Sequence, residues 1–188
     1  MAPKGAGKTE GGRPIVARVF QPKLQLQQVV PEFKLPSTAG ERIGPWDFKQ
    51  RRNLVLFFFH TEDCEGCADL LREFAKDYPL YIQQEAEILA ITTRPLEQAQ
   101  ILAADLSLPF PVLSDSSGEA TREYTYLDAA GQALPSVFVV DRFGALYTQV
   151  IAERESQLPS SEEILEWLGL IEVQCPECGV PEWPSLGM

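Results

Sequence analysis

The sequence predicts an α/β fold in which helices flank a central mixed sheet. Continuous apolar runs of strand length, typical of strands buried on both faces, occupy residues 54–59, 87–92 and 137–140. After each of the first two runs, apolar residues recur every three to four positions, which predicts a helix. The third run is followed by a hairpin pattern, so the predicted order is strand, helix, strand, helix, hairpin and a closing helix.

The elements before the middle of the chain follow from local signals. Residues 29–48 hold short apolar stretches broken by prolines and glycines, which favour a β-hairpin that caps the sheet. The first helix carries Cys67, Leu70, Leu71 and Phe74 on one face. Pro95 opens the second helix, at a position where proline is tolerated.

The remaining elements are shorter. Residues 110–114 predict a short strand, and the turn that follows supplies caps for a short helix over residues 119–124. A glycine-containing loop joins strand 137–140 to strand 145–151. Ser160 and Glu163 form a capping box for the last helix, which we expect Gly169 to stop.

Length and composition favour one domain with tails. The chain has 188 residues, of which 45% are hydrophobic, enough for one sizeable core. We expect an N-terminal tail over residues 1–22, the folded domain over 23–170, and a C-terminal tail over 171–188.

The formal net charge is −11, which argues against nucleic acid and anionic membrane surfaces as partners, because both require a positive field. The first residues lack the apolar region of a secretory signal, and no later run reaches transmembrane length. We therefore expect a cytoplasmic protein, where paired cysteines are more often catalytic or metal-bound than structural.

Cys64 and Cys67 form a Cys-x-x-Cys at the start of the first predicted helix. Unpaired N–H groups and the helix dipole favour an anion there, which would be a thiolate, the form that attacks disulfides and peroxides. Neighbouring carboxylates at Glu62, Asp63 and Glu65 oppose thiolate formation. The same spacing also supplies half of a zinc site.

Two further features belong to the candidate chemistry. His60 is the only histidine, four residues before Cys64, and is either a proton carrier, a copper ligand or a side chain that simply ends the strand. Cys175 and Cys178 form a second Cys-x-x-Cys in the tail. This pair is a redox arm that exchanges with the first pair, part of a four-cysteine zinc site, or an unreactive or intermolecular disulfide.

The segments PEFKLPSTAGERI, NLVLFFFHTEDCEGC, EILAITTRPLEQAQILAADLSLPFPVLSD and LPSVFVVDRFG resemble the peroxiredoxin-like branch of the thioredoxin superfamily, the alkyl hydroperoxide reductase C / thiol-specific antioxidant family. The resemblance covers residues 29–168. It implies a thioredoxin-like fold with an N-terminal β-hairpin extension, and an antioxidant oxidoreductase that uses no organic cofactor and no metal.

The family loop pattern, Pro-x-x-x-Thr-x-x-Cys, fits this chain in two registers. Counted from the strand, His60 takes the proline position, Cys64 the threonine position and Cys67 that of the peroxidatic cysteine. Counted from Thr61, Cys64 becomes the peroxidatic residue. The family arginine before the later strand is replaced by Pro135, and that arginine orients and polarises peroxide.

Pro135 also resembles the proline of thioredoxin-like dithiol oxidoreductases, which follows a cis peptide bond beside the Cys-x-x-Cys. The resemblance implies a cis Leu134–Pro135 bond. The backbone of Leu134 would then be exposed for pairing with a substrate chain.

The leading hypothesis is a thiol–disulfide oxidoreductase or a thiol peroxidase that acts through Cys64 and Cys67. The expected partners are a disulfide or peroxide substrate and a thioredoxin-like electron donor. The oligomeric state stays open, with a dimer among the options. The alternatives are a non-enzymatic zinc- or copper-binding module and an inactive redoxin scaffold.

Overall fold

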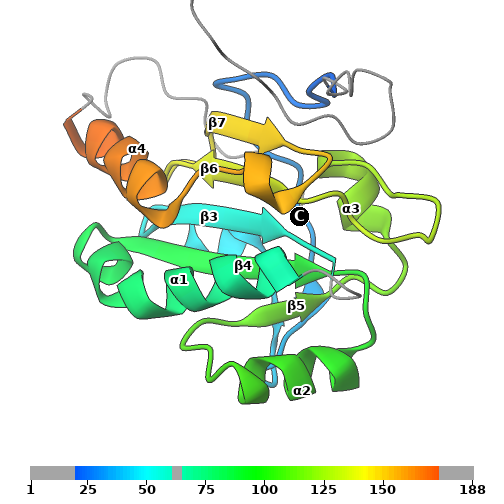
Figure 1. The fold of residues 1–188 in the computed structure, drawn as a ribbon. Coiled ribbons are helices and arrows are strands. Elements are labelled where there is room, and N and C mark those ends of the chain that lie inside the picture. The colour runs from blue at the N-terminus through cyan, green and yellow to red at the C-terminus, as the bar shows by residue number, and fades with distance from the viewer. Residues whose placement is uncertain (1–19, 61–64, 174–188) are drawn as a thin grey trace, which may run out of the picture.

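The computed structural model describes residues 20–60 and 65–173 (Figure 1). The strands in these residues are β1 (Leu35–Pro36), β2 (Arg42–Ile43), β3 (Asn53–Phe58), β4 (Ala86–Thr92), β5 (Val112–Ser114), β6 (Ser136–Val140) and β7 (Leu146–Ile151). Two short 3-10 helices are η1 (Pro45–Phe48) and η2 (Glu155–Gln157). The α-helices are α1 (Glu65–Gln83), α2 (Leu96–Asp105), α3 (Glu119–Tyr124) and α4 (Ser161–Val173). The predicted order of strands and helices is confirmed.

The central sheet is mixed, as predicted, with the strand order β5-β4-β3-β6-β7. Strands β3, β4 and β5 are parallel, whereas β6 runs antiparallel to β3 and β7 antiparallel to β6. The predicted N-terminal hairpin is also confirmed, because β1 and β2 pair antiparallel, and a bridge from Ser37 to Leu113 joins the hairpin to β5.

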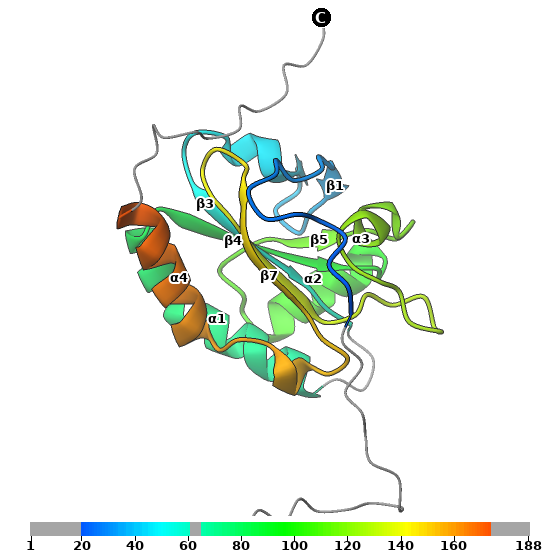
Figure 2. The same ribbon diagram turned by 90° about the horizontal axis from the view of Figure 1, so that it is seen from above.

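Side chains of β3 alternate between two cores. Val55, Phe57 and Phe59 lie in the core covered by α1, α2 and α4, whereas Leu54 and Phe58 lie in the core covered by α3 and the N-terminal segment. Figures 1 and 2 show α1 and α4 together on one side of the sheet. Every β3 residue is buried, which explains why its sequence is continuously apolar rather than alternating.

Helix α4 does not stop at Gly169, so that prediction is wrong. The helix continues to Val173 because its last turn has tertiary contacts. Asn53 Nδ2 donates a hydrogen bond of 2.8 Å to Glu172, and Arg142 forms an ion pair with the same carboxylate. These contacts offset the cost of one helical glycine, about 1 kcal/mol. The division of the chain into tails and domain at residues 22 and 170 stays a prediction.

Helix α1 continues through Pro79, which removes one backbone N–H from the helix interior. The helix persists because Tyr81, beyond the proline, is fully buried and packs edge-on against Phe74. Its hydroxyl lies 3.0 Å from Ser161 Oγ, so α1 is tied to the start of α4.

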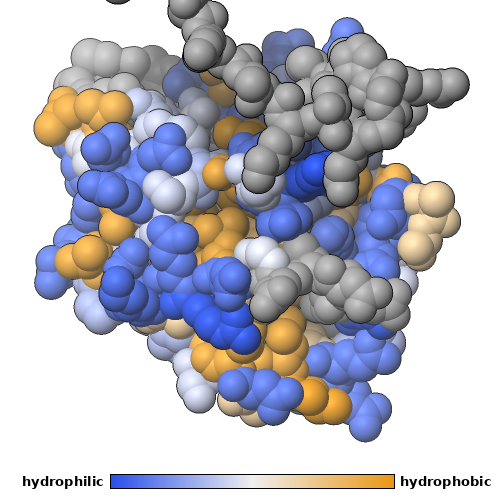
Figure 3. Space-filling model, viewed as in Figure 1, coloured by the Kyte–Doolittle hydropathy of each residue, from blue (hydrophilic) through white to orange (hydrophobic). Residues whose placement is uncertain are grey.

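Most of the face seen in Figure 3 is polar, with an apolar area over α2 at its lower edge. Ile101 of α2 is an exposed apolar side chain. Within residues 20–60 and 65–173, none of the helices has the length and apolar character that a membrane span requires.

Candidate functional site

The candidate site lies where the carboxyl end of β3 meets the first turn of α1. Phe59 N–H donates a hydrogen bond of 3.0 Å to Ile91 O, so the chain stays beside β4 up to Phe59, one residue past β3 and directly before His60. Thr61 and Cys64, two of the predicted site residues, lie outside the described part of the chain. His60 and Cys67 are described on either side of that gap.

The structure brings His60 and Cys67 together. His60 Nδ1 lies 3.9 Å from Cys67 Sγ. Cys67 is only 1% exposed and is the third residue of α1. It belongs to the apolar face shared with Leu70 and Phe74, as predicted. An imidazole at this distance can take a proton from the thiol or return one, so this geometry permits the role of proton carrier for His60.

Pro135 reaches the same edge of the sheet, because Ser136 pairs with Phe58 in the β3–β6 register. The predicted cis bond before it is wrong: the Leu134–Pro135 peptide is trans. Local hydrogen bonds stabilise this trans arrangement. Leu134 N–H donates to Tyr126 O over 2.8 Å, and Ser136 Oγ donates to Leu134 O over 2.9 Å.

These hydrogen bonds also correct the expectation of an exposed Leu134 backbone. Both of its polar groups have partners within the chain, and Pro135 O accepts from Ala152 N–H over 2.9 Å. A substrate chain would have to displace these contacts before pairing here.

Arg94 is a residue of this edge that the sequence argument did not single out. It follows β4, the parallel neighbour of β3, and its carbonyl accepts a hydrogen bond of 2.6 Å from Ser114 Oγ of β5. The carboxyl ends of parallel strands share one edge of a sheet, and that rule could have identified Arg94 as a cation at the edge where β3 ends.

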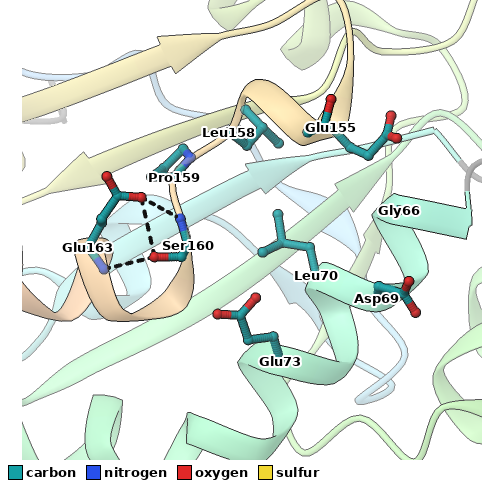
Figure 4. Close-up of a pocket in the computed structure, with 10 residues that line it drawn as sticks. Gly66, Asp69, Leu70, Glu73, Glu155, Leu158, Pro159, Ser160 and Glu163 are labelled. Atoms are coloured by element: carbon teal, nitrogen blue, oxygen red, sulfur yellow. Dashed lines mark hydrogen bonds between the residues drawn. The ribbon is translucent and has the colours of Figure 1, made fainter.

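A groove of about 360 Å³ lies beside the first turns of α1, between that helix and the η2–α4 connection (Figure 4). Four carboxylates line it: Asp69, Glu73, Glu155 and Glu163. Two of them cap α4, because Ser161 N–H donates to Glu73 over 3.0 Å and Ser160 N–H donates to Glu163 over 2.9 Å. The predicted capping box of Ser160 and Glu163 is thereby confirmed.

Glu155 lies directly over Gly66, the residue before Cys67. A Cβ atom at Gly66 would lie 2.2 Å from Glu155 Cγ, so glycine leaves the room that this side chain occupies. The groove places negative charge beside the first turns of α1, which adds to the carboxylates that the sequence places around the Cys-x-x-Cys.

Within the described residues, no group of three metal-ligating side chains comes together. Cys175 and Cys178, like Cys64, lie outside the described part, so the metal-binding alternative gains no support from the structure.

Comparison with known proteins identifies the class. The sequence matches the AhpC/TSA family over residues 26–149, and the chain belongs to that family. It is 29% identical over 129 residues to alkyl hydroperoxide reductase E of Mycobacterium tuberculosis, a match that covers 65% of this chain and 82% of the relative. It is 25% identical over 126 residues to the chloroplastic peroxiredoxin Q of Triticum aestivum, covering 66% of this chain and 58% of the relative.

Solved structures agree on the fold. Mycobacterium tuberculosis AhpC superposes with a TM-score of 0.70 at 21% identity, covering 80% of this chain and 94% of that one. The peroxidoxin BcpB of the same organism superposes with a TM-score of 0.68 at 18% identity, covering 79% and 98%. The fold is the thioredoxin-like fold of peroxiredoxins, as the sequence predicts.

Proposed function

We propose that this chain is a thiol peroxidase that reduces a peroxide with Cys64 and Cys67. The observation that carries the proposal is the buried sulfur of Cys67 in the first turn of α1, 3.9 Å from His60 Nδ1. Membership of the AhpC/TSA family supports it, as do relatives named as peroxiredoxins and alkyl hydroperoxide reductases.

The exposure of Cys67 suggests the order of the steps. A thiol that is 1% exposed is poorly placed to meet a substrate first, so we assign the first attack to Cys64. The Cys64 thiolate attacks one peroxide oxygen, the O–O bond breaks, and the leaving oxygen takes a proton to become an alcohol or water. Cys64 becomes a sulfenic acid.

Cys67 then resolves the sulfenic acid. Its sulfur attacks the Cys64 sulfur, and the S–O bond breaks. His60 accepts the proton of the Cys67 thiol and passes it to the leaving hydroxide, which departs as water. The resulting Cys64–Cys67 disulfide returns to two thiols by exchange with an external dithiol.

The surroundings of Pro135 favour the peroxidase over a protein disulfide reductase. A disulfide reductase of this fold would hold its substrate chain on the backbone beside the dithiol, where the Leu134 N–H and carbonyl already have partners. A peroxide is small enough to need no such pairing.

The remaining partners are part of the proposal. We assign the role of reductant to a thioredoxin-like dithiol protein and the location to the cytoplasm. A dimer also remains a proposal, which sedimentation at micromolar concentrations tests.

A steady-state assay tests the function. Consumption of hydrogen peroxide and an organic hydroperoxide is followed with thioredoxin or dithiothreitol as reductant, for the wild type, Cys64→Ser and Cys67→Ser. We expect turnover in the wild type, its loss in Cys64→Ser, and a single sulfenic acid per chain in Cys67→Ser. No turnover in the wild type with either reductant would favour the inactive scaffold instead.

A further inference from the structure

A small pocket lies at the amino end of β3, opposite the dithiol. It has a volume of about 260 Å³ and is lined by Phe48, Arg51, Arg52 and Glu87. Glu87 is already satisfied, because Tyr78 OH donates to it over 2.7 Å and Arg52 Nη1 lies 3.2 Å from its other oxygen. The pocket therefore presents an aromatic ring and guanidinium groups, and its size suits one large side chain.

The neighbourhood of this pocket has unpaired positive charge. Arg51 and Arg42 donate only to backbone carbonyls, those of Asp47 and Lys34. Neither has a carboxylate within ion-pair distance among residues 20–60 and 65–173, and the same holds for Lys49. In a chain with a net charge of −11, these cations are available for an acidic partner.

Helix α4 ends beside the same region. Glu172, in its last turn, accepts a hydrogen bond from Asn53, the residue after Arg52, and pairs with Arg142, which also pairs with Glu85 at 3.0 Å. Figure 2 shows the end of α4 and the η1–β3 connection toward one end of the molecule, and the start of α1 at the other. The chain that follows Val173 thus begins near the pocket.

We propose that the segment of residues 174–188 docks on this pocket, with Glu182 paired to Arg51 and Trp183 packed against Phe48 and the guanidinium groups. Adjacent Glu182 and Trp183 match the pocket in charge and in shape. Indole is the best aromatic partner of a guanidinium, and its burial is favourable. This inference is independent of the proposed peroxidase activity.

Chain length permits this docking and constrains the second cysteine pair. Ten residues separate Val173 from Trp183, a reach of roughly 33–36 Å, ample for the pocket. Cys178 is only five residues from Val173, a reach of about 18 Å at most. Residues 53 to 60, which run from the end of α4 to the neighbourhood of Cys67, span roughly 23 Å. Because this span exceeds the reach of Cys178, we place Cys175 and Cys178 at the amino end of the sheet, away from Cys67 of the same chain.

Tryptophan NMR tests the docking. The chain has three tryptophans, so protein labelled with ¹⁵N-tryptophan gives three indole signals, and Trp183→Phe assigns one of them. We expect the Trp183 indole to resonate away from the position of free tryptophan, unchanged on tenfold dilution. Arg51→Glu and Glu182→Arg should each move it to the free position, and the double variant Arg51→Glu/Glu182→Arg should restore it.

The controls separate docking from other effects. Lys76→Glu reverses an exposed charge on α1 that does not line the pocket and should leave the signal in place. Glu182→Arg changes only the segment beyond α4, so it reports on docking even where Arg51→Glu unfolds the domain. A wild-type Trp183 signal at the free position would overturn the proposal. So would a signal that Glu182→Arg does not move, or one that depends on concentration, which would indicate docking on a second copy.

Discussion

His60 and Cys67 are the residues on which the chemistry depends most. They come from different elements, yet the end of β3 and the first turn of α1 place Nδ1 3.9 Å from Sγ. The thiol is buried among apolar side chains. We propose that His60 carries the proton that this thiol loses when its sulfur attacks.

Replacing His60 tests this role. We expect His60→Asn, which keeps a polar side chain but cannot act as a base, to slow disulfide formation about 100-fold, the lower end of the range for loss of a general base. The sulfenic acid on Cys64 should live correspondingly longer when trapped with dimedone and quantified by mass spectrometry. The rate of the first step, measured in the Cys67→Ser background, should change little. An unchanged sulfenic acid lifetime would remove His60 from the resolving step.

For single residues, the sequence indicated which side chains are candidates better than it indicated how they are placed in space. The position of Cys67 on the buried face of a helix followed from its spacing to Leu70 and Phe74. The contact with His60 did not, because it depends on how the end of β3 and the first turn of α1 are placed in space. The isomer before Pro135 was also wrong, because the hydrogen bonds of Leu134 and Ser136 that hold it are not visible in a sequence.

Two glycines test how the elements are built. Gly169 lies inside α4 with nothing within 4 Å of a Cβ atom placed there, whereas at Gly44 that atom would lie 1.7 Å from the backbone oxygen of Phe33. Gly169→Ala should therefore stabilise the protein by about 0.5–1 kcal/mol, the gain in helix propensity. Gly44→Ala should destabilise it by about 2 kcal/mol or more, because backbone cannot move aside.

Urea unfolding measures both effects. If α4 ended at Gly169, as its sequence suggested, Gly169→Ala would bring no gain. A Gly44→Ala variant of wild-type stability would contradict the close approach of the β2–η1 connection to Phe33.

Asp141 makes the turn between β6 and β7 sensitive to pH. Its Oδ1 accepts hydrogen bonds from Phe143 N–H at 2.9 Å and Ala145 N–H at 2.8 Å, yet burial outweighs them and raises the pKa of this carboxyl. A raised pKa in the folded state means that the folded protein holds a proton that the unfolded chain releases. The contribution of Asp141 is therefore present at low pH and is lost as pH rises from the ordinary aspartate pKa, about 3.9, through the raised value.

Asp141→Asn keeps the accepting oxygen and removes the titration. We expect wild type to lose stability relative to Asp141→Asn as pH rises above the ordinary aspartate pKa, in urea unfolding at several pH values. Asp141→Ala, which leaves two N–H groups without an acceptor, should be less stable than both at every pH. If the free energies of unfolding of wild type and Asp141→Asn differed by the same amount at every pH, burial would not shift the pKa of this carboxyl.

The elements themselves were largely predictable, since hydrophobic period, capping residues and turn residues are local. The wrong prediction at Gly169 falls where tertiary contacts override local preference, because Glu172 and its partners carry α4 past that glycine. In the same way, the burial of Tyr81 carries α1 past Pro79.

For the whole molecule, the two ends of the sheet hold different features. His60 and Cys67 lie at the carboxyl end of β3, whereas α4 ends at the amino end, where Glu172 contacts Asn53. The mixed sheet and its hairpin extension were predictable from the order of elements. The separation that we propose for the two cysteine pairs was not, because it depends on where α4 stops and which way it runs.

This separation predicts that the second pair is dispensable for chemistry at the first. The double variant Cys175→Ser/Cys178→Ser should turn over peroxide with dithiothreitol at a rate within about twofold of wild type. Cys64→Ser, which disrupts the first cysteine pair, is the matched control in the same assay. A more than tenfold loss in the double variant would mean that the tail cysteines act in turnover.

The most direct test of the account is the disulfide that forms in one turnover. Fully reduced protein is treated with one molar equivalent of hydrogen peroxide, alkylated at once, digested and analysed by mass spectrometry. The account predicts a Cys64–Cys67 disulfide, with Cys175 and Cys178 recovered as alkylated thiols. A Cys175–Cys178 disulfide with Cys64 and Cys67 alkylated, or peroxide left unconsumed, would contradict it.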